Sequence, residues 1–284
     1  MAEQTVTLGG LKLTSLDAGE FLYDGGAMFG AVPKIIWEGL VPCDDQNRIT
    51  LTLSPLLIDS GERKILVDVG FGARHTKRDL KIFGFDPSRN VETALARRGL
   101  APGDIDTVVL THLHCDHAAG ATRDGSGGVE PAFPNARYVV NALEWEDALD
   151  PDPRSAAAYR RDDFVPLEEA GQLELVGDSC DVAEGVTLVR TGGHTRGHSM
   201  VIVETGEGTA AYPADLIPIR YHARVPYVAG VDTFPLEMID QKEKFLNAAV
   251  DGHWIVILDH DTAGNVGRIV RDERGRFAFR DIEA

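Results

Sequence analysis

The stretch Thr111-His112-Leu113-His114-Cys115-Asp116-His117 decides how this chain is interpreted, because it places four potential metal ligands within six residues. The ligands are three imidazoles and one carboxylate in the pattern H-x-H-x-D-H. This set suits zinc, iron and manganese and leaves coordination positions open to water. The preceding residues 106–110 are mostly apolar and β-branched, which indicates a buried strand. The motif therefore predicts a metal site on a loop between a strand and a helix N-terminus.

Four ligands on one loop do not complete a site for two metals, so further ligands are expected later in the chain. Three later stretches share one form, a short apolar strand followed by a polar side chain at its C-terminal end. Residues 186–190 lead to His194 through a Gly-Gly turn, residues 210–212 lead to Asp215, and residues 254–258 lead to His260. The repetition of this form supports the prediction more strongly than any single stretch does.

The order of these motifs resembles the metallo-β-lactamase superfamily over nearly the whole chain. The order is H-x-H-x-D-H, then Gly-His-Thr-x-Gly-His-Ser, a lone aspartate and a late histidine. Residues 65–70, Ile-Leu-Val-Asp-Val-Gly, are similar to an early signature of that superfamily. Residues 24–34 are similar to YtnP-type quorum-quenching lactonases, and methyl-parathion-hydrolase-like enzymes are similar relatives. The resemblance implies an α/β fold, the αββα sandwich, with metals at one edge between two sheets.

The resemblance also implies a centre of two divalent ions, zinc first, with manganese, iron and cobalt compatible. Seven ligands are implied: His112, His114 and His194 for the first ion, Asp116, His117 and His260 for the second, and Asp215 as a bridge. Asp68 would orient a ligand histidine, or it is an ordinary strand-end residue. Asp259 and Asp261 flank His260 and are alternative ligands, although the histidine is preferred. Cys115 is interpreted as a small filler, and His198 is left outside the ligand set.

The chemistry expected of two such ions is hydrolysis. The pKa of a water bound to both ions falls from 15.7 to about 7, and the resulting hydroxide can attack a carbonyl or phosphoryl centre. Asp116, a ligand beside this nucleophile, would carry a proton to the leaving oxygen. We therefore predict a metal-dependent carboxylic ester hydrolase that opens lactones, N-acyl-homoserine lactones first. A phosphotriesterase or arylesterase is the alternative. A non-hydrolytic metal-binding protein is less favoured, because every ligand position is intact.

The substrate-binding residues are less constrained than the ligands. Several N-acyl-homoserine lactonases have a tyrosine three residues after the bridging aspartate, where this chain has Pro218. Tyr221 and His222 are close by and either substitute for it or pack within a loop. Phe29 and Trp37 belong to an apolar N-terminal segment that lines a substrate cleft, forms a dimer contact or packs in the core. We predict substrate contacts for these four residues.

Composition bounds the remaining possibilities. The chain has 284 residues, 43% of them hydrophobic, and lacks a convincing linker, which predicts a single domain over 1–284. A net charge of −17 weighs against nucleic acid as substrate, and the basic run from Arg74 to Lys81 is interpreted as a solvated face. No signal peptide or membrane-spanning stretch is evident, and three unpaired cysteines suit a reducing compartment. We predict a cytoplasmic enzyme acting on a small molecule, with no membrane partner, compatible with a homodimer.

Local patterns predict several elements outside the motifs. Turn residues between apolar runs predict hairpins at 5–8 with 11–16, 56–58 with 64–67, and 200–204 with 209–212. Asp86-Pro87 predicts the start of a helix, with the aspartate as N-cap, an apolar face of Val91, Ala94 and Leu95, and an end at Gly99. Hairpins with interspersed helices predict two mixed sheets with helices outside.

Overall fold

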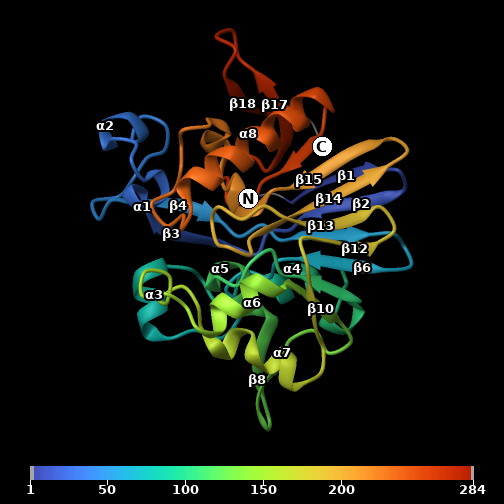
Figure 1. The fold of residues 1–284 in the computed structure, drawn as a ribbon. Coiled ribbons are helices and arrows are strands. Elements are labelled where there is room, and N and C mark those ends of the chain that lie inside the picture. Colours follow the sequence, from blue (N-terminus) through green and yellow to red (C-terminus); the bar gives the residue numbers. More distant parts are fainter. Residues whose placement is uncertain (1–2, 283–284) are drawn as a thin grey trace.

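Two seven-stranded sheets pack face to face in the computed structural model, which describes residues 3–282 (Figure 1). The strands of the first sheet are, in spatial order, β1 (Gln4–Leu8), β2 (Leu11–Ser15), β5 (Leu56–Asp59), β6 (Lys64–Val67), β7 (Thr107–Val109), β10 (Arg137–Asn141) and β11 (Leu173–Val176). The strands of the second are β12 (Ser179–Ala183), β13 (Val186–Arg190), β14 (Ser199–Thr205), β15 (Gly208–Tyr212), β16 (Ile255–Ile257), β17 (Val266–Arg271) and β18 (Phe277–Asp281). Both sheets mix parallel and antiparallel pairs, as predicted.

Two small sheets and a set of helices complete the described part of the chain. The small sheets pair β3 (Glu20–Asp24) with β4 (Arg48–Thr52), and β8 (Thr122–Gly125) with β9 (Gly128–Pro131). The α-helices are α1 (Gly25–Phe29), α2 (Lys34–Trp37), α3 (Lys77–Phe83), α4 (Val91–Arg97), α5 (Cys115–Ala118), α6 (Ala142–Leu149), α7 (Val165–Glu169) and α8 (Pro235–Asp251). The three predicted hairpins are confirmed as β1–β2, β5–β6 and β14–β15.

Three apolar layers hold the sandwich together, because strand residues point alternately to opposite faces of a sheet. In β5, Leu56 and Ile58 face the other sheet, whereas Leu57 faces the helices of the first half. The layer between the sheets is built from side chains of both, such as Val109 and Val201. A third layer packs α8 against the outer face of the second sheet. The predicted two-sheet arrangement with helices outside is therefore confirmed.

The predicted start of α4 is wrong, because the helix begins about one helical turn later than Asp86-Pro87 predicts. The carboxylate of Asp86 accepts hydrogen bonds from the backbone N–H and the hydroxyl of Ser88, and so forms a turn rather than a cap. The helix begins at Val91, where Asn90 and Thr93 form reciprocal capping bonds. Its predicted apolar face is buried, and Gly99 follows its last turn with a φ of 74°.

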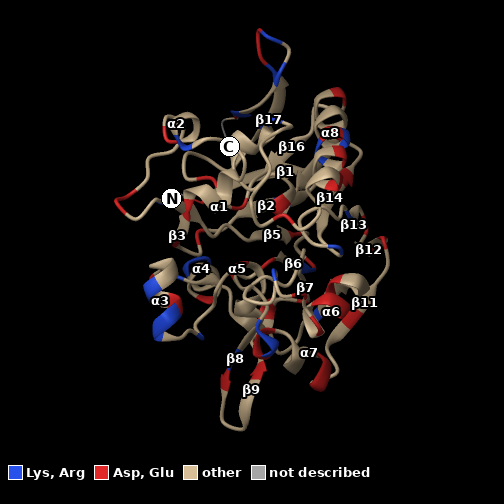
Figure 2. Ribbon diagram, turned by 60° about the vertical axis from the view of Figure 1, so that its left-hand side comes forward, with Lys and Arg blue, Asp and Glu red and all other residues tan. Residues whose placement is uncertain are grey.

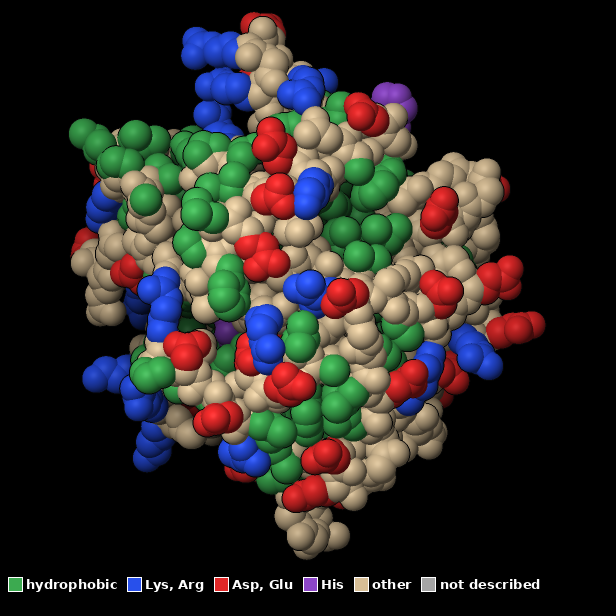
Figure 3. All heavy atoms as spheres, viewed as in Figure 1, with side chains coloured by type: hydrophobic (Ala, Val, Ile, Leu, Met, Phe, Trp, Pro, Cys, Tyr) green, Lys and Arg blue, Asp and Glu red, His purple; other side chains and the backbone are tan. Residues whose placement is uncertain are grey.

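Charged and apolar side chains are unevenly distributed on the surface. Basic residues gather on α3, where Lys77, Arg78 and Lys81 are exposed, as predicted for a solvated face (Figure 2). Hydrophobic side chains gather over α2, where Ile35 and Ile36 are 82% and 50% exposed (Figure 3). No helix within residues 3–282 is both long and apolar enough to cross a bilayer.

Candidate metal centre

The candidate ligands gather at one edge of the sandwich, because each follows the C-terminal end of a strand. The loop from His112 to His117 follows β7 in the first sheet and runs into α5. The other three ligand positions follow strands of the second sheet: His194 after β13, Asp215 after β15 and His260 after β16. The structure thus brings all seven predicted ligands together from both sheets.

Asp215 lies at the middle of the cluster, and its two carboxylate oxygens face different histidines. Oδ2 is 3.1 Å from Nε2 of His194 and 3.9 Å from Nε2 of His112. Oδ1 is 3.5 Å from Nε2 of His117 and 3.4 Å from Nε2 of His260. This division of one carboxylate between two groups of imidazoles is the geometry that a bridging ligand requires.

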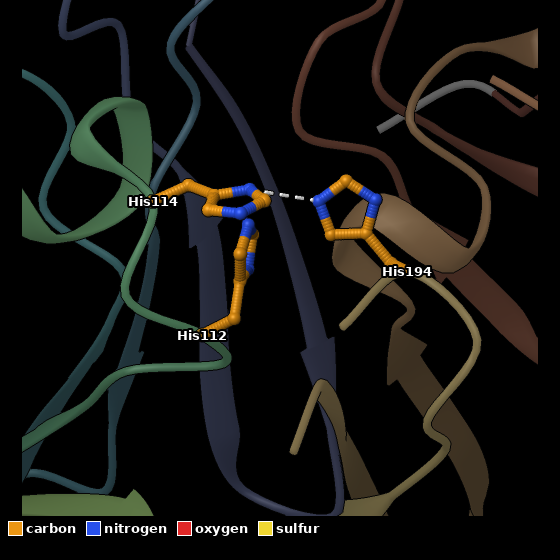
Figure 4. A group of neighbouring side chains, drawn as sticks. All are labelled: His112, His114 and His194. Carbon is orange, nitrogen blue, oxygen red and sulfur yellow. Dashed lines mark hydrogen bonds between the residues drawn. The ribbon is translucent and has the colours of Figure 1, made fainter. Parts of the chain in front are cut away.

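The first group of imidazoles comprises His112, His114 and His194. Their candidate ligand atoms all lie within 4.8 Å of one another, and the three side chains are buried. Figure 4 shows the rings converging, with Nδ1 of His114 and Nε2 of His194 3.0 Å apart. The turn that presents His194 is built as predicted, since Gly192 and Gly193 have φ of 66° and 82°.

The second group comprises Asp116, His117 and His260, whose candidate ligand atoms also lie within 4.8 Å of one another. The two imidazole Nε2 atoms are 3.2 Å apart. Oδ2 of Asp116 lies 3.8 Å from Nε2 of His117 and 3.9 Å from that of His260. Asp116 stands in the first turn of α5 and lines the adjoining cavity.

Hydrogen bonds on the outer side of the rings fix which nitrogen is free to bind metal. Nδ1 of His117 is 2.9 Å from Oδ2 of Asp68, and Nδ1 of His194 is 2.7 Å from Oδ1 of Asp232. Nδ1 of His260 is 2.7 Å from the carbonyl oxygen of Thr52. Carboxylate and carbonyl oxygens accept, so each Nδ1 donates its proton and each Nε2 keeps the lone pair that a metal needs. Asp68 thus holds His117, a candidate ligand, and is more than a strand-end turn residue.

The protonation preferences of the cluster follow from burial and from its carboxylates. Burial lowers the pKa of His112 and of His114 well below the usual range, which favours the neutral imidazole. Burial opposes charge on His117 as well, but Asp215, Asp116 and Asp68 outweigh it and raise the pKa of His117. Burial likewise raises the pKa of Asp215, yet His194 and His117 reverse this and hold it well below its usual value.

The donor set fits divalent metal ions. Imidazole nitrogens from different strands point at one another inside the protein, and among the described residues Nε2 of His112 and Oδ1 of Asp215 are buried without a hydrogen-bond partner. Buried polar atoms normally have partners, so such atoms facing one point need another group. Two groups of nitrogen and carboxylate donors sharing one aspartate match the donor preferences of zinc and related ions.

The residues considered above as alternatives to the seven candidate ligands form other contacts. Asp261 is paired with Arg220, 2.9 Å away, and Oδ1 of Asp259 accepts from the backbone of Ser54. Nδ1 of His198 is bonded to the hydroxyl of Thr191, and His198 belongs to none of the candidate metal groups found in residues 3–282. Cys115 belongs to none of these groups either, and burial raises the pKa of its thiol to about 12. Asp259 does belong to one candidate metal group, with Asp68 and His117, and its Oδ2 lies 3.4 Å from Nδ1 of His117. That nitrogen is the one bonded to Asp68, so this group lies on the outer side of the ring, and His260 remains the preferred ligand.

A sequence profile of the metallo-beta-lactamase superfamily matches residues 54–260. The chain belongs to this superfamily. The match includes every candidate ligand and most of both sheets, and it confirms the resemblance inferred from the motifs.

Curated relatives carry names consistent with this superfamily. A probable metallo-hydrolase of Mycobacterium bovis is 29% identical over 209 residues, which cover 63% of each chain. The match therefore spans somewhat less than two thirds of that relative's length. An N-acyl homoserine lactonase of Bacillus cereus is 26% identical over 214 residues, covering 66% of this chain and 78% of the relative.

Solved structures agree with the metallo-β-lactamase fold predicted from the sequence. A probable metal-dependent hydrolase from Staphylococcus aureus has a TM-score of 0.88 at 28% identity, covering 98% of this chain and 100% of that one. AidC, described as a dizinc quorum-quenching lactonase, has a TM-score of 0.82 at 18% identity, covering 100% and 98%. Because the identity with AidC is only 18%, this likeness shows the fold alone.

In this superfamily member a cavity of ≈ 310 Å³ opens directly onto the candidate metal centre. Asp116, Asp215 and His260 form part of its wall, and much of the remainder is apolar. The apolar lining includes the side chains of Phe21, Met28, Leu51, Phe83 and Pro218. A predominantly apolar cavity with a few convergent polar groups is the usual form of a small-molecule site.

The structure places the four predicted substrate-binding residues outside this cavity's lining. Phe29 and Trp37 are fully buried and stacked on each other, with ring centroids 5.4 Å apart. His222 is buried beneath them, and its Nε2 lies 3.0 Å from the carbonyl oxygen of Met28. Tyr221 lines a smaller cavity of ≈ 200 Å³ on another side of His260. Of the N-terminal segment, Tyr23 and Met28 are the residues that reach the metal-centre cavity.

Two residues that organise the centre were missed by the sequence analysis. The buried carboxylate of Glu144 accepts from the backbone N–H of Leu113 at 2.9 Å and from the hydroxyls of Tyr159 and Thr195. It therefore ties the first ligand loop to the turn that carries His194. Asp232 holds His194 directly and also accepts from the backbone N–H of Ala229. Neither residue lies in a recognisable motif.

Replacing Asp232 by alanine is expected to weaken the ion held by His112, His114 and His194 by roughly 10- to 100-fold, because the ring loses the acceptor that orients it. Chelator competition measures this affinity. Asp232→Asn, which keeps an acceptor, should restore part of the loss. The ion at His117 and His260 should be little affected. Unchanged affinity in Asp232→Ala would show that the turn alone orients the ring.

Proposed function

We propose that this protein is a metal-dependent hydrolase of small molecules and that it opens lactones. The observation that carries the proposal is the position of Asp215, whose two oxygens face two groups of imidazoles beside a mostly apolar cavity. The names of the N-acyl homoserine lactonase relatives support the choice of substrate. The net charge of −17 disfavours polyanionic substrates.

The proposed centre holds two divalent ions, with zinc as the first choice. His112, His114 and His194 would hold one ion, His117, His260 and Asp116 the other, and Asp215 both. When bound, the ions would supply Lewis acidity and lower the pKa of a shared water, the source of the nucleophile.

The chain's own residues have distinct tasks in this proposal. Asp68 and Asp232 keep two imidazoles in the tautomer that binds metal. Phe21 and Phe83 form apolar walls that would seat the acyl chain and exclude water. Asp116 lies at the cavity with its carboxylate beside His117 and His260, where it would carry a proton to the leaving oxygen.

A hydrolysis panel on metal-analysed protein tests the proposal. Its members are lactones of several acyl-chain lengths, aryl esters, phosphotriesters, phosphodiesters and β-lactams, compared by kcat/KM. We expect lactones with medium or long acyl chains to be the best substrates. A higher kcat/KM for a phosphotriester or aryl ester than for every lactone would reassign the substrate class. No turnover of any ester by metal-loaded protein would overturn the hydrolase proposal.

A further inference from the structure

Tyr23 lines the cavity at the metal centre from β3, outside the loops that carry the candidate ligands. It lies on β3, two residues after Phe21, and alternation along a strand places both on one face. The ring of Phe21 packs 5.5 Å from the ring of His260, and the centroids of Phe21 and Tyr23 are 6.2 Å apart. Both aromatic residues line the cavity at the metal centre. Tyr23 is therefore the next residue after Phe21 on the face of β3 that lines the cavity.

Two other side-chain donors in this wall have hydrogen-bond partners. The hydroxyl of Ser155 is 2.6 Å from Oδ2 of Asp152, and the guanidinium of Arg154 donates to the carbonyl oxygen of Gly230. The Cys115 thiol is a weak donor. By contrast, none of the described residues forms a hydrogen bond with the Tyr23 hydroxyl. Outside the candidate ligands, Tyr23 thus supplies a free neutral donor beside Phe21, whereas the remaining N–H groups of Arg154 belong to an exposed side chain.

The Tyr23 side chain lines the same cavity as Asp116 and Asp215. Burial raises the pKa of Tyr23, and the carboxylates of Asp116 and Asp215 raise it further. Those two aspartates are the ones that face the candidate metal positions. The phenol therefore stays protonated at neutral pH and can donate a hydrogen bond to an oxygen of a bound molecule. Pro218, which has neither a side-chain donor nor a backbone N–H, lines the same cavity.

We propose that Tyr23 is a catalytic residue that donates a hydrogen bond to the carbonyl oxygen of the substrate as this oxygen gains negative charge. The inference rests on the proposed lactone hydrolysis. The hydroxyl keeps its proton throughout, so the step requires no acid or base beyond those already described. A donor aimed at a developing oxyanion lowers the barrier more than it strengthens substrate binding, because the charge appears only in the transition state.

The test is Tyr23→Phe, which removes only the hydroxyl. With N-decanoyl-homoserine lactone we expect kcat to fall by about 100-fold, the lower end for the loss of one oxyanion donor. KM should change little, and metal content and Tm should match those of the parent protein. Tyr227→Phe is the matched control, because Tyr227 is a half-buried tyrosine that does not line the cavity. It should leave kcat unchanged.

A second readout does not depend on turnover. The γ-lactam with the same acyl chain is resistant to hydrolysis, and its carbonyl carbon can be labelled with ¹³C. A hydrogen bond weakens the carbonyl bond, so the infrared stretch of the bound lactam should lie at lower frequency in the parent protein than in Tyr23→Phe. Tyr227→Phe should give the parent frequency.

Several outcomes would overturn the assignment. If Tyr23→Phe keeps its kcat and its carbonyl frequency, the hydroxyl does not reach the substrate. A fall in kcat that follows loss of metal or of Tm would make Tyr23 a structural residue, and a rise in KM alone would make it a packing contact. If the parent protein opens no lactone at all, the proposed function fails and this inference fails with it. An active parent beside an equally active Tyr23→Phe overturns the tyrosine's role alone.

Discussion

Asp215→Ala is expected to lower kcat/KM for the best lactone by several orders of magnitude and to reduce bound metal below two ions per chain. The reason is geometric, since within residues 3–282 this is the carboxylate that faces both groups of imidazoles, with Oδ1 toward His117 and His260 and Oδ2 toward His194. Removing this side chain takes one ligand from each proposed ion. It also removes the negative charge between the two ions. Metal analysis and steady-state kinetics measure the two effects.

The control for this variant is Asp124→Ala, which removes an aspartate whose side chain is 84% exposed on β8. It should keep both ions and the parent rate. Parent protein stripped by a chelator should lose activity and regain it when zinc is added, whereas Asp215→Ala should not regain it. Two tightly held ions and a near-parental rate in Asp215→Ala would contradict the bridging assignment.

His194→Ala and His198→Ala form a matched pair within one turn, and we expect very different results from them. Nε2 of His194 lies 3.1 Å from Asp215 and 3.0 Å from Nδ1 of His114, so its loss should remove the first ion and most activity. His198 is buried beside the same cluster but is bonded to the hydroxyl of Thr191. Its replacement should act mainly on stability, with both ions retained.

Metal content and Tm, measured on both variants, separate these effects. A His198→Ala protein that loses an ion while His194→Ala keeps two would mean that the ligand had been assigned to the wrong histidine of the turn. Equal loss of metal in both variants would indicate that the turn, rather than one imidazole, determines binding.

Local sequence was sufficient to predict how the ligands assemble. An apolar run followed by a ligand at its C-terminal end recurs four times, and such ends meet at one edge of a layered fold. The hairpins were predictable for the same reason, since their apolar runs and turn residues are adjacent in the chain. The residues that hydrogen-bond to the candidate ligands, or to the loops that carry them, could not be predicted in this way. Asp232 is 38 positions from His194, and Glu144 is 31 positions from Leu113, so only tertiary packing brings each pair together.

The structure departs from the sequence expectations at two places for equally local reasons. Asp86-Pro87 suits a helix start and a turn alike, and the reciprocal capping bonds of Asn90 and Thr93 place the helix start four residues later. Phe29 and Trp37 lie on helices of five and four residues, too short for a periodic pattern to tell an inward face from a cavity wall. Mutual stacking draws both into the core, and Tyr23 reaches the cavity instead.

The division of the ligands between the two sheets has a consequence for synthesis on the ribosome. Residues 112–117 are made first, but the proposed shared ligand and its last partner, Asp215 and His260, emerge near the end of the chain. In the proposed centre neither metal position would be complete until Asp215 has emerged, so full loading would follow docking of the second sheet on the first. Metal bound only by the docked state stabilises that state by mass action. We therefore expect chelation to loosen the junction between the sheets before either sheet unfolds, seen as faster amide exchange at the ends of β7 and β15.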